Sequence, residues 1–291
     1  MDEVLNFKEL SKQLELNFVV NGKAKSTLNN YLRCLAHLGL HYKISPEQLS
    51  EEQIQDYLFY CKSLHKTPSE SFFKHTVYGL RALYKVLGLK DKRISLPQIK
   101  AQNSLPVVLS KQEVKELLHA PKFLRHRLML GMLYGCGLRS YELCNLKLSE
   151  VDFERRTVFI RKQKGNFDRY LPLSKYLVRG LKEYIATECS VEYLFNSQVT
   201  DNGKPRGLSR STIQWVIKEN RSKVATHKKI TSHTHTYATH LLEEGLNIMA
   251  LKELLGHARI ETTIIYLHVT NTGNSVKFSP LDTLYSTDEK A

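Results

Sequence analysis

The sequence lacks the long apolar runs and the leader pattern that mark membrane and exported proteins. A membrane-spanning helix needs about 20 consecutive apolar residues, and no such run occurs among the 291 residues. A signal peptide needs an apolar core behind basic residues, whereas the first twenty residues alternate charged and hydrophobic side chains. We therefore expect a cytoplasmic protein that is neither exported nor inserted into a membrane.

The cysteines lack the spacing of a zinc site or of a disulfide framework. They form no C-x-x-C pair and none of the spacings that zinc sites use. A cytosolic protein keeps such thiols reduced, and an unpaired cysteine packs as a small hydrophobic side chain. We expect reduced, mostly buried thiols at all five positions: Cys34, Cys61, Cys136, Cys144 and Cys189.

Positive charge is what the sequence has in excess. Its 43 Lys and Arg residues outnumber its 29 Asp and Glu residues, which gives a formal net charge of +14 at pH 7. A field of this sign attracts polyanions, and DNA or RNA is the natural candidate. Charge alone does not choose the chemistry, because many soluble proteins are basic.

The hydrophobic pattern predicts a helical module in residues 1–98. One helix follows Ser26, a candidate cap, and a second follows the capping-box pattern at 50–53. A third covers 73–87 and is ended by Gly88. The first helix is the clearest, because its apolar residues recur at helical spacing: Leu28, Tyr31, Leu32, Leu35 and Leu38.

A second domain is expected after a linker. Residues 90–106 are polar and proline-bracketed, without helical period, so we place a linker at 99–107 and a domain at 108–291. Another capping-box pattern at 110–113 opens this domain. The overall prediction is a mainly α fold with a small antiparallel β-sheet. Its expected strands are 157–161 and 169–173, and its expected helices are 128–138, one from about 139, 209–216, 235–244 and 248–255.

The most specific pattern lies in residues 254–266, where Tyr266 follows His257 by nine positions and His257 follows a glycine that ends a helix. A phenol is a weak nucleophile at neutral pH, because its pKa is about 10, so it needs activating partners. This segment resembles the nucleophile segment of the tyrosine recombinases, the phage integrase family. The resemblance implies that Tyr266 is the nucleophile and that His257 stabilises the reacting phosphate. Alternatively, Tyr266 simply fills the core of a short helix.

Two upstream segments extend the resemblance. Residues 134–143 are similar to the family's box around its first catalytic arginine, here Arg139, and Glu142 is placed to orient it. A guanidinium suits phosphate because it makes two charge-assisted hydrogen bonds and keeps its charge. Residues 164–173 are similar to the family's β-hairpin, which implies that Lys164 protonates the leaving 5′ oxygen. Taken alone, the Arg–Glu pair reads as a surface ion pair and Lys164 as a phosphate contact.

Residues 230–243 depart from the family's pattern of His-x-x-Arg-His-Ser/Thr-Tyr/Phe-Ala-Thr-His. From His235 onward the match is complete. A gapped alignment takes His233 as the family's histidine, whereas an ungapped one puts Thr231 at the histidine and Thr234 at the arginine. Both leave the second catalytic arginine unfilled, and losing one such donor typically costs about 10²–10³ in rate. We keep His233 as a catalytic candidate and His235 as a supporting residue.

The same histidines superficially resemble metal ligands, but we expect no metal. His235 and His240 are about 140° apart on a helix, which fits poorly with shared coordination. Zinc also needs further ligands and supporting carboxylates, and only Glu243 and Glu244 lie nearby. No other cofactor is expected. We assign DNA contacts to Arg169, Lys228, Lys229 and Arg259.

The resemblance covers nearly the whole chain and implies a site-specific DNA recombinase or integrase of a mobile genetic element, associated with the nucleoid. Its implied partner is double-stranded DNA, bound by a homodimer at each site and by a homotetramer in synapsis. The implied tetramer exchanges a C-terminal segment, for which 279–285 is the candidate. Two alternatives stay open: a catalytically impaired DNA-binding protein of this fold, and a topoisomerase-type enzyme that nicks and rejoins DNA without synapsis.

Overall fold

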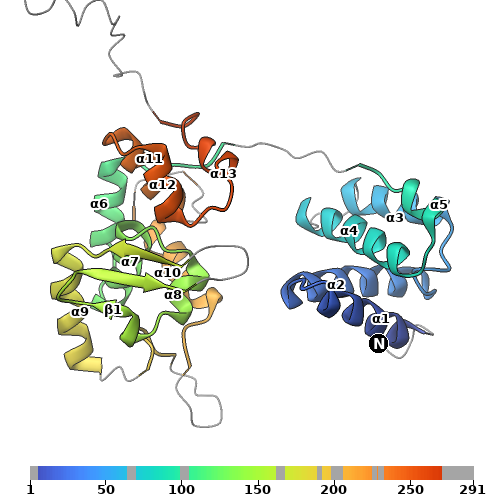
Figure 1. The fold of residues 1–291 in the computed structure, drawn as a ribbon, viewed down its shortest axis with the longest axis horizontal. Coiled ribbons are helices and arrows are strands. Elements are labelled where there is room, and N and C mark those ends of the chain that lie inside the picture. Colours follow the sequence, from blue (N-terminus) through green and yellow to red (C-terminus); the bar gives the residue numbers. More distant parts are fainter. Residues whose placement is uncertain are drawn as a thin grey trace, which may run out of the picture. The chain divides into compact units, whose positions relative to one another are not determined.

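The chain forms two compact units, Met1–Asn103 and Ser104–Ala291, in a computed structural model (Figure 1). The predicted linker at 99–107 spans the boundary between them. The structure describes residues 6–63, 70–98, 105–161, 168–188, 192–197, 206–224, 228 and 233–270.

The first unit consists of helices packed around one apolar core, drawn from blue to cyan in Figure 1. α2 and α4 lie along each other, and α1 packs against both. Their contact faces follow from the helical spacing of leucine and aromatic residues, which places one apolar stripe toward the core. The helices are α1 (Phe7–Val20), α2 (Lys25–Tyr42), α3 (Glu51–Ser63), α4 (Glu70–Val86) and α5 (Lys90–Ile94).

The predicted caps have different outcomes. The capping box at the start of α3 is confirmed, because Gln53 N donates to Ser50 Oγ at 3.1 Å and Ser50 N donates to Gln53 Oε1 at 2.9 Å. The predicted cap at Ser26 is wrong. α2 begins one residue earlier, behind Ala24, whose extended backbone makes no side-chain cap. The helix therefore starts without the side-chain acceptor that usually satisfies its first amides.

The stretch after α4 was expected to lack helical structure, and this expectation is wrong for residues 90–94. They form α5, which packs against α4. Lys92 Nζ donates to the carbonyl oxygens of Glu47 and Leu49, both at 2.8 Å, and Leu96 is buried. Lys92 thus satisfies carbonyl groups of the segment between α2 and α3 and holds this polar sequence against the unit. Residues 90–98 belong to the first unit.

The second unit is also mainly helical and carries the predicted small sheet. β1 (Val151–Asp152), β2 (Thr157–Ile160) and β3 (Arg169–Pro172) run antiparallel in the order β1-β2-β3. The register pairs Ile160 with Arg169. The helices are α6 (Lys111–His119), α7 (Leu124–Gly135), α8 (Ser140–Asn145), α9 (Lys175–Glu188), α10 (Arg210–Arg221), α11 (Thr234–Glu243), α12 (Ile248–Leu255) and α13 (Glu261–Ile264).

The sequence predicted most of these elements and missed α9, β1 and α13. The two longer strands, the capping box at Ser110 and the bounds of α12 are confirmed, whereas α7 begins and ends a few residues before the predicted 128–138. α9 is amphipathic, and its apolar face packs against α7. The predicted turn around Lys164 lies outside the described residues.

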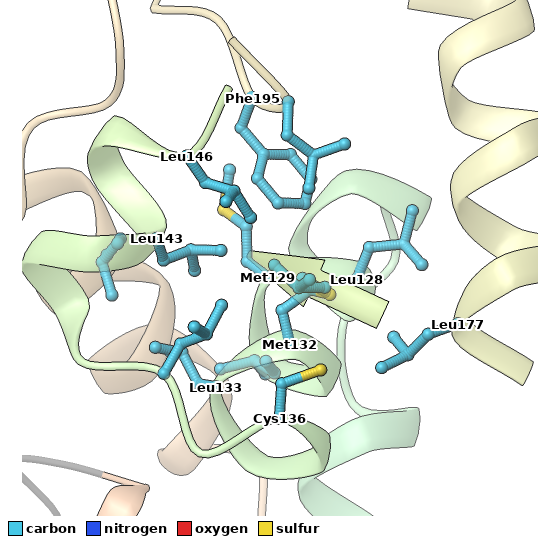
Figure 2. Packing of buried hydrophobic residues seen from close by; sticks show 14 of the residues in the cluster. Leu128, Met129, Met132, Leu133, Cys136, Leu143, Leu146, Leu177 and Phe195 are labelled. Carbon is cyan, nitrogen blue, oxygen red and sulfur yellow. The ribbon is translucent and has the colours of Figure 1, made fainter. Parts of the chain in front are cut away.

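α7 is the centre of the second unit's core. Its side chains are buried nearly all round, because α6, α8, α9, α10 and α11 all contact it. Figure 2 shows Met129 and Met132 of α7, with Cys136 directly after it, among Leu143 of α8 and Leu177 of α9. A helix covered on every side is a rigid base. The residues that follow it, 136–139, lead directly into the candidate site.

The cysteine prediction is confirmed at four positions. Cys34, Cys61, Cys136 and Cys144 are buried free thiols, and burial raises the pKa of each. Cys189 lies outside the described residues. No helix in the described part of the chain is long and apolar enough to cross a membrane.

Candidate active site

Two arginines share one buried carboxylate at the start of α8. The Arg139 backbone N donates to Glu142 Oε2 at 2.8 Å, and its Nη1 donates to Oε1 at 3.0 Å. Arg169 Nη2 donates to both oxygens of Glu142 at 2.9 Å. The Glu142 and Arg169 side chains are only 4% and 6% exposed, whereas that of Arg139 is 33% exposed. Glu142 therefore fixes Arg139 while part of its guanidinium faces outward.

Arg169 was expected to contact DNA, but the structure places it elsewhere. It extends from β3 into the interior, where Nε also donates to the carbonyl of Leu254 at 2.8 Å. Its side chain lies against Gly256, and a Cβ built there would come within 3.1 Å of Nη1. This geometry ties β3 to the end of α12 and favours a structural role for Arg169. An alternating strand pattern does not tell an inward arginine from an outward one.

His257 directly follows the helix stop of α12. Gly256 adopts φ = +64°, a left-handed conformation that suits glycine, and it turns the chain at the C-cap. His257 Nδ1 lies 2.9 Å from the buried hydroxyl of Thr263. Burial, followed by the charges of Arg139, Arg169 and His235, lowers the pKa of His257 to about 4. The imidazole is therefore neutral at pH 7.

Thr263 is a site residue that the sequence reasoning missed. When its hydroxyl donates to Nδ1 of His257, the remaining ring proton is on Nε2, which leaves a neutral donor for a phosphate oxygen. The available signal was its place three residues before Tyr266, inside the motif that was read only for its histidine and tyrosine.

Tyr266 follows α13, and its ring is buried at 2% exposure. Its hydroxyl oxygen lies 3.1 Å from His235 Nδ1, on the first turn of α11. Burial raises the pKa of Tyr266, and the charge of Arg139 opposes that rise. Burial also lowers the pKa of His235. In Figure 1, α11, α12 and α13 are drawn together in orange and red, and contacts join α12 to both.

His233 does not join this cluster. It is the N-cap residue of α11 and is 2% exposed, and no residue in the described part of the chain makes a hydrogen bond with its buried Nε2. Burial lowers its pKa to about 4. The next residue, Thr234, donates its hydroxyl to the carbonyl of Leu138 at 3.3 Å, directly beside Arg139. This contact joins the start of α11 to the residue that precedes Arg139.

Buried polar contacts hold α11 in place. His240 Nε2 lies 2.8 Å from the carbonyl of Leu109, and its Nδ1 lies 2.9 Å from the hydroxyl of Tyr134 on α7. The ring of Tyr237 packs against Gly137, where a Cβ would come within 2.3 Å of it. Gly137 also has φ = +64°. Only glycine fits here, which explains the glycine two residues before Arg139.

A hollow of about 650 Å³ adjoins the site. It is lined by residues of β3 and its approach, by α12, and by the turn at Gly256 and His257. One wall therefore carries Arg169 and Tyr170, and another carries Lys252 and His257. The hollow lies beside the hairpin whose turn holds Lys164, a residue outside the described part of the chain.

The other candidate DNA contacts are more scattered. Arg259 is exposed on the turn between α12 and α13. Lys228 forms an ion pair with Glu113 at 2.8 Å, and Lys229 lies outside the described residues. Within the described ranges, no group of three or more His, Cys, Asp or Glu residues could hold a metal ion. His235 and His240 instead contact different tyrosines.

Sequence comparison identifies the family. The profile of the phage integrase family matches residues 107–272, which is more than half of the chain. The chain belongs to this family of tyrosine recombinases. It is 34% identical over 275 residues to tyrosine recombinase XerA of Pyrococcus horikoshii, covering 92% of each protein. It is 32% identical over 285 residues to XerD of Staphylococcus saprophyticus, covering 94% of each.

Solved structures agree with the fold of this tyrosine recombinase. A crystal structure of XerA recombinase matches 98% of the chain and 99% of that protein at 26% identity, with a TM-score of 0.52. XerH site-specific recombinase bound to a palindromic difH substrate, a post-cleavage complex, matches 96% of the chain and 85% of that protein, with a TM-score of 0.67 at 19% identity. The fold class predicted from sequence is confirmed.

Proposed function

We propose that this protein cuts and rejoins duplex DNA by transesterification through a 3′-phosphotyrosyl intermediate. The observation that carries the proposal is the placement of the Tyr266 hydroxyl next to a histidine and within the field of Arg139. A recombinase needs this combination, because a neutral phenol must lose its proton while charge develops on the phosphate.

In the proposed reaction, the Tyr266 oxygen attacks the scissile phosphorus and the bond to the 5′ oxygen breaks. Arg139, oriented by Glu142, and His257, oriented by Thr263, donate hydrogen bonds to the non-bridging oxygens. The leaving 5′ oxygen takes a proton from Lys164, as the family resemblance implies. The reverse attack by a 5′-hydroxyl reseals the strand. No ATP is consumed, because the new phosphodiester keeps the bond energy.

His233 is not part of the proposed catalytic set. Its burial and unpartnered Nε2 favour a packing position, and Thr234 cannot make the bidentate contact of an arginine. The proposed machinery is therefore Arg139, Lys164, His257 and Tyr266. Arg259 is placed to contact the DNA backbone, because it is exposed next to His257.

The partner in this proposal is double-stranded DNA. The net charge of +14 supports it, and several solved proteins of the same fold are described as bound to DNA. Phosphate contacts release counterions, so the affinity should fall steeply with salt. We further propose a dimer on each recombination site and a tetramer in synapsis.

One observation favours an impaired, DNA-binding member of the family as the second candidate function. In the ungapped alignment Thr234 takes the position of the family's second arginine, and its buried hydroxyl donates to the carbonyl of Leu138. This candidate predicts binding without any covalent adduct. A topoisomerase-type enzyme would instead relax supercoiled DNA as a monomer.

The test is an adduct assay. Duplex sites are selected by binding from a randomised pool and resynthesised with a nick at successive positions, so that cleavage releases a short strand and traps the intermediate. The proposal expects a protein–DNA band on a denaturing gel that Tyr266→Phe abolishes. Tyr176→Phe is the matched control, because Tyr176 is an exposed tyrosine on α9, and it should form the adduct normally. Binding with no adduct at any nick would support the impaired candidate.

A further inference from the structure

The geometry points to His235 as the group that takes the proton from Tyr266 when the phenol attacks DNA. This inference rests on the proposed transesterification and deepens it. From the sequence, His235 was expected only to support the site. In the structure its Nδ1 lies 3.1 Å from the Tyr266 hydroxyl oxygen, close enough to accept the hydroxyl proton.

Three histidines stand near the N-terminus of α11 and the turn after α12, and the structure separates their roles. The Nδ1 of His257 forms a hydrogen bond with the hydroxyl of Thr263. His233 is buried with Nε2 unpartnered, and no hydrogen bond of its side chain to Tyr266 occurs among the described residues. His235 is the histidine whose ring nitrogen meets the phenol oxygen.

The direction of the hydrogen bond follows from burial. Tyr266 is 2% exposed, so its hydroxyl proton needs an acceptor inside the protein. Nδ1 of His235 can accept it only when the ring proton is on Nε2. A neutral phenol therefore donates to a neutral imidazole in the resting state, which is the arrangement from which proton transfer begins.

The surroundings keep this pair ready at neutral pH. Burial lowers the pKa of His235, which favours the neutral ring whose Nδ1 accepts the hydrogen bond of the phenol. Burial raises the pKa of Tyr266 and keeps the resting phenol neutral, while the charge of Arg139 opposes that rise and so favours the phenolate as it forms. Among the described residues, His235 also interacts electrostatically with His257, whose pKa of about 4 leaves it neutral at pH 7.

The proton balance is complete. Tyr266 gives its hydroxyl proton to Nδ1, the phenolate oxygen bonds to phosphorus, and the bond to the 5′ oxygen breaks. The 5′ oxygen receives its proton from a separate donor. His235 is then an imidazolium, and in the resealing step it returns the proton to Tyr266 as the 5′-hydroxyl attacks. His235 is partly exposed, so the imidazolium retains access to water.

The matched pair of variants is His235→Asn and His235→Ala, measured in single-turnover cleavage of the nicked duplex. The asparagine oxygen can occupy the position of Nδ1 and accept the hydrogen bond, but it cannot take a proton at neutral pH. A general base typically contributes about 10²–10⁴ in rate. We expect both variants to bind DNA normally and to cleave at least about 100-fold more slowly. His126→Ala, a histidine beside Trp215, is the control and should cleave normally.

Two readouts distinguish a base from a positioning residue. The wild-type rate should stay level above the pKa of His235 and fall in acid, whereas the variant rates should rise steadily with pH as the phenol ionises unaided. Added imidazole should partly restore His235→Ala. When the scissile 5′ oxygen of the DNA is replaced by sulfur, the leaving group departs without a proton from an acid. The His235 variants should therefore cleave this DNA as slowly, relative to the wild type, as they cleave normal DNA. Restored cleavage would make His235 the acid and overturn the inference.

Other outcomes would also overturn it. Normal cleavage by His235→Asn would mean that the hydrogen bond only positions Tyr266, and faster cleavage by His235→Ala would mean that it holds the buried phenol back. These results differ from a failure of the proposed function, in which the wild-type protein would form no adduct that Tyr266→Phe abolishes.

Discussion

The two units of this recombinase bury very different side chains. Among the described residues, the first unit buries the hydroxyl side chains of Ser45 and Thr76 and no charged side chain. The second buries the ion pair of Glu142 with Arg169 and the polar residues of α11, including His233, Thr236 and His240. Burying polar groups costs free energy unless each one finds a partner. The second unit therefore buries polar and charged groups at the site in addition to its apolar core, whereas the first unit buries mainly its apolar core.

The largest effect should come from Glu142→Gln. This change removes the charge that compensates two arginines, one of which is buried, and breaking such a pair typically costs about 3–5 kcal/mol. We expect a loss of that order in the unfolding free energy of the second unit, measured by denaturant titration. The control is Glu244→Gln, which breaks the exposed pair with Lys111 and should cost at most about 1 kcal/mol. Equal losses would contradict the account.

Arg139→Ala should separate activity from stability. Glu142 keeps its partner Arg169 when Arg139 is removed, so the fold should hold. Cleavage should fall by about 10²–10³, or roughly 3–4 kcal/mol of transition-state stabilisation. The comparison variant is Leu80→Ala in the first unit, where a fully buried leucine should cost about 2–5 kcal/mol of stability. A stable Arg139→Ala protein with wild-type cleavage would remove Arg139 from the site.

His233→Leu should stabilise the second unit, and more so in acid. The folded-state pKa of about 4 lies below the ordinary value of 6.5. Between these values the unfolded chain binds a proton that the folded chain does not, so stability is lost as pH falls from 6.5 to 4. The shift corresponds to about 3 kcal/mol at pH 4. Leucine removes this loss, although the unfolding free energy still depends on pH through His235 and His257. Denaturant titrations of both proteins at pH 7 and pH 5 measure the difference in unfolding free energy. Cleavage at pH 7 should be unchanged.

The smallest effects should come from matched cap changes in the two units. Ser50→Ala and Ser110→Ala each remove the acceptor of a capping box, at α3 and α6. Each should cost about 1 kcal/mol in its own unit. Neither should alter the rate of cleavage at saturating DNA. A catalytic defect in Ser110→Ala alone would mean that α6 contributes to the site, which the comparison of the two units does not predict.

Local signals in the sequence predicted most of the helices and strands. The capping boxes at Ser50 and Ser110, the glycine stops and the two main strands depend on neighbouring residues, and they were predicted correctly. α5 was missed because its stability comes from Lys92 reaching carbonyl groups more than 40 residues away in sequence. Such tertiary contacts leave no periodic pattern.

The site was predictable in its residue types and only partly in its contacts. Arg139 with Glu142 and His257 with Tyr266 follow motifs of short spacing. The inward direction of Arg169, the burial of His233 and the contact of His235 with Tyr266 do not follow from such motifs. The contacts of Arg169 with Glu142, of His235 with Tyr266 and of Arg169 with Leu254 span 27, 31 and 85 residues, so they depend on where β3, α11 and α13 lie in the fold. The hydrogen bond of Thr234 to the Leu138 carbonyl is likewise a contact between distant segments, which the sequence did not indicate.

The most direct test of the account is to identify the residue that becomes linked to DNA. The trapped adduct is digested with nuclease and trypsin, and the nucleotide-bearing peptide is sequenced by mass spectrometry. Cleavage after Arg259 and Lys277 gives a peptide of residues 260–277 whose single tyrosine is Tyr266. The account predicts the nucleotide on this tyrosine, through its 3′ phosphate. A nucleotide on any other residue, or one joined through its 5′ phosphate, would contradict it.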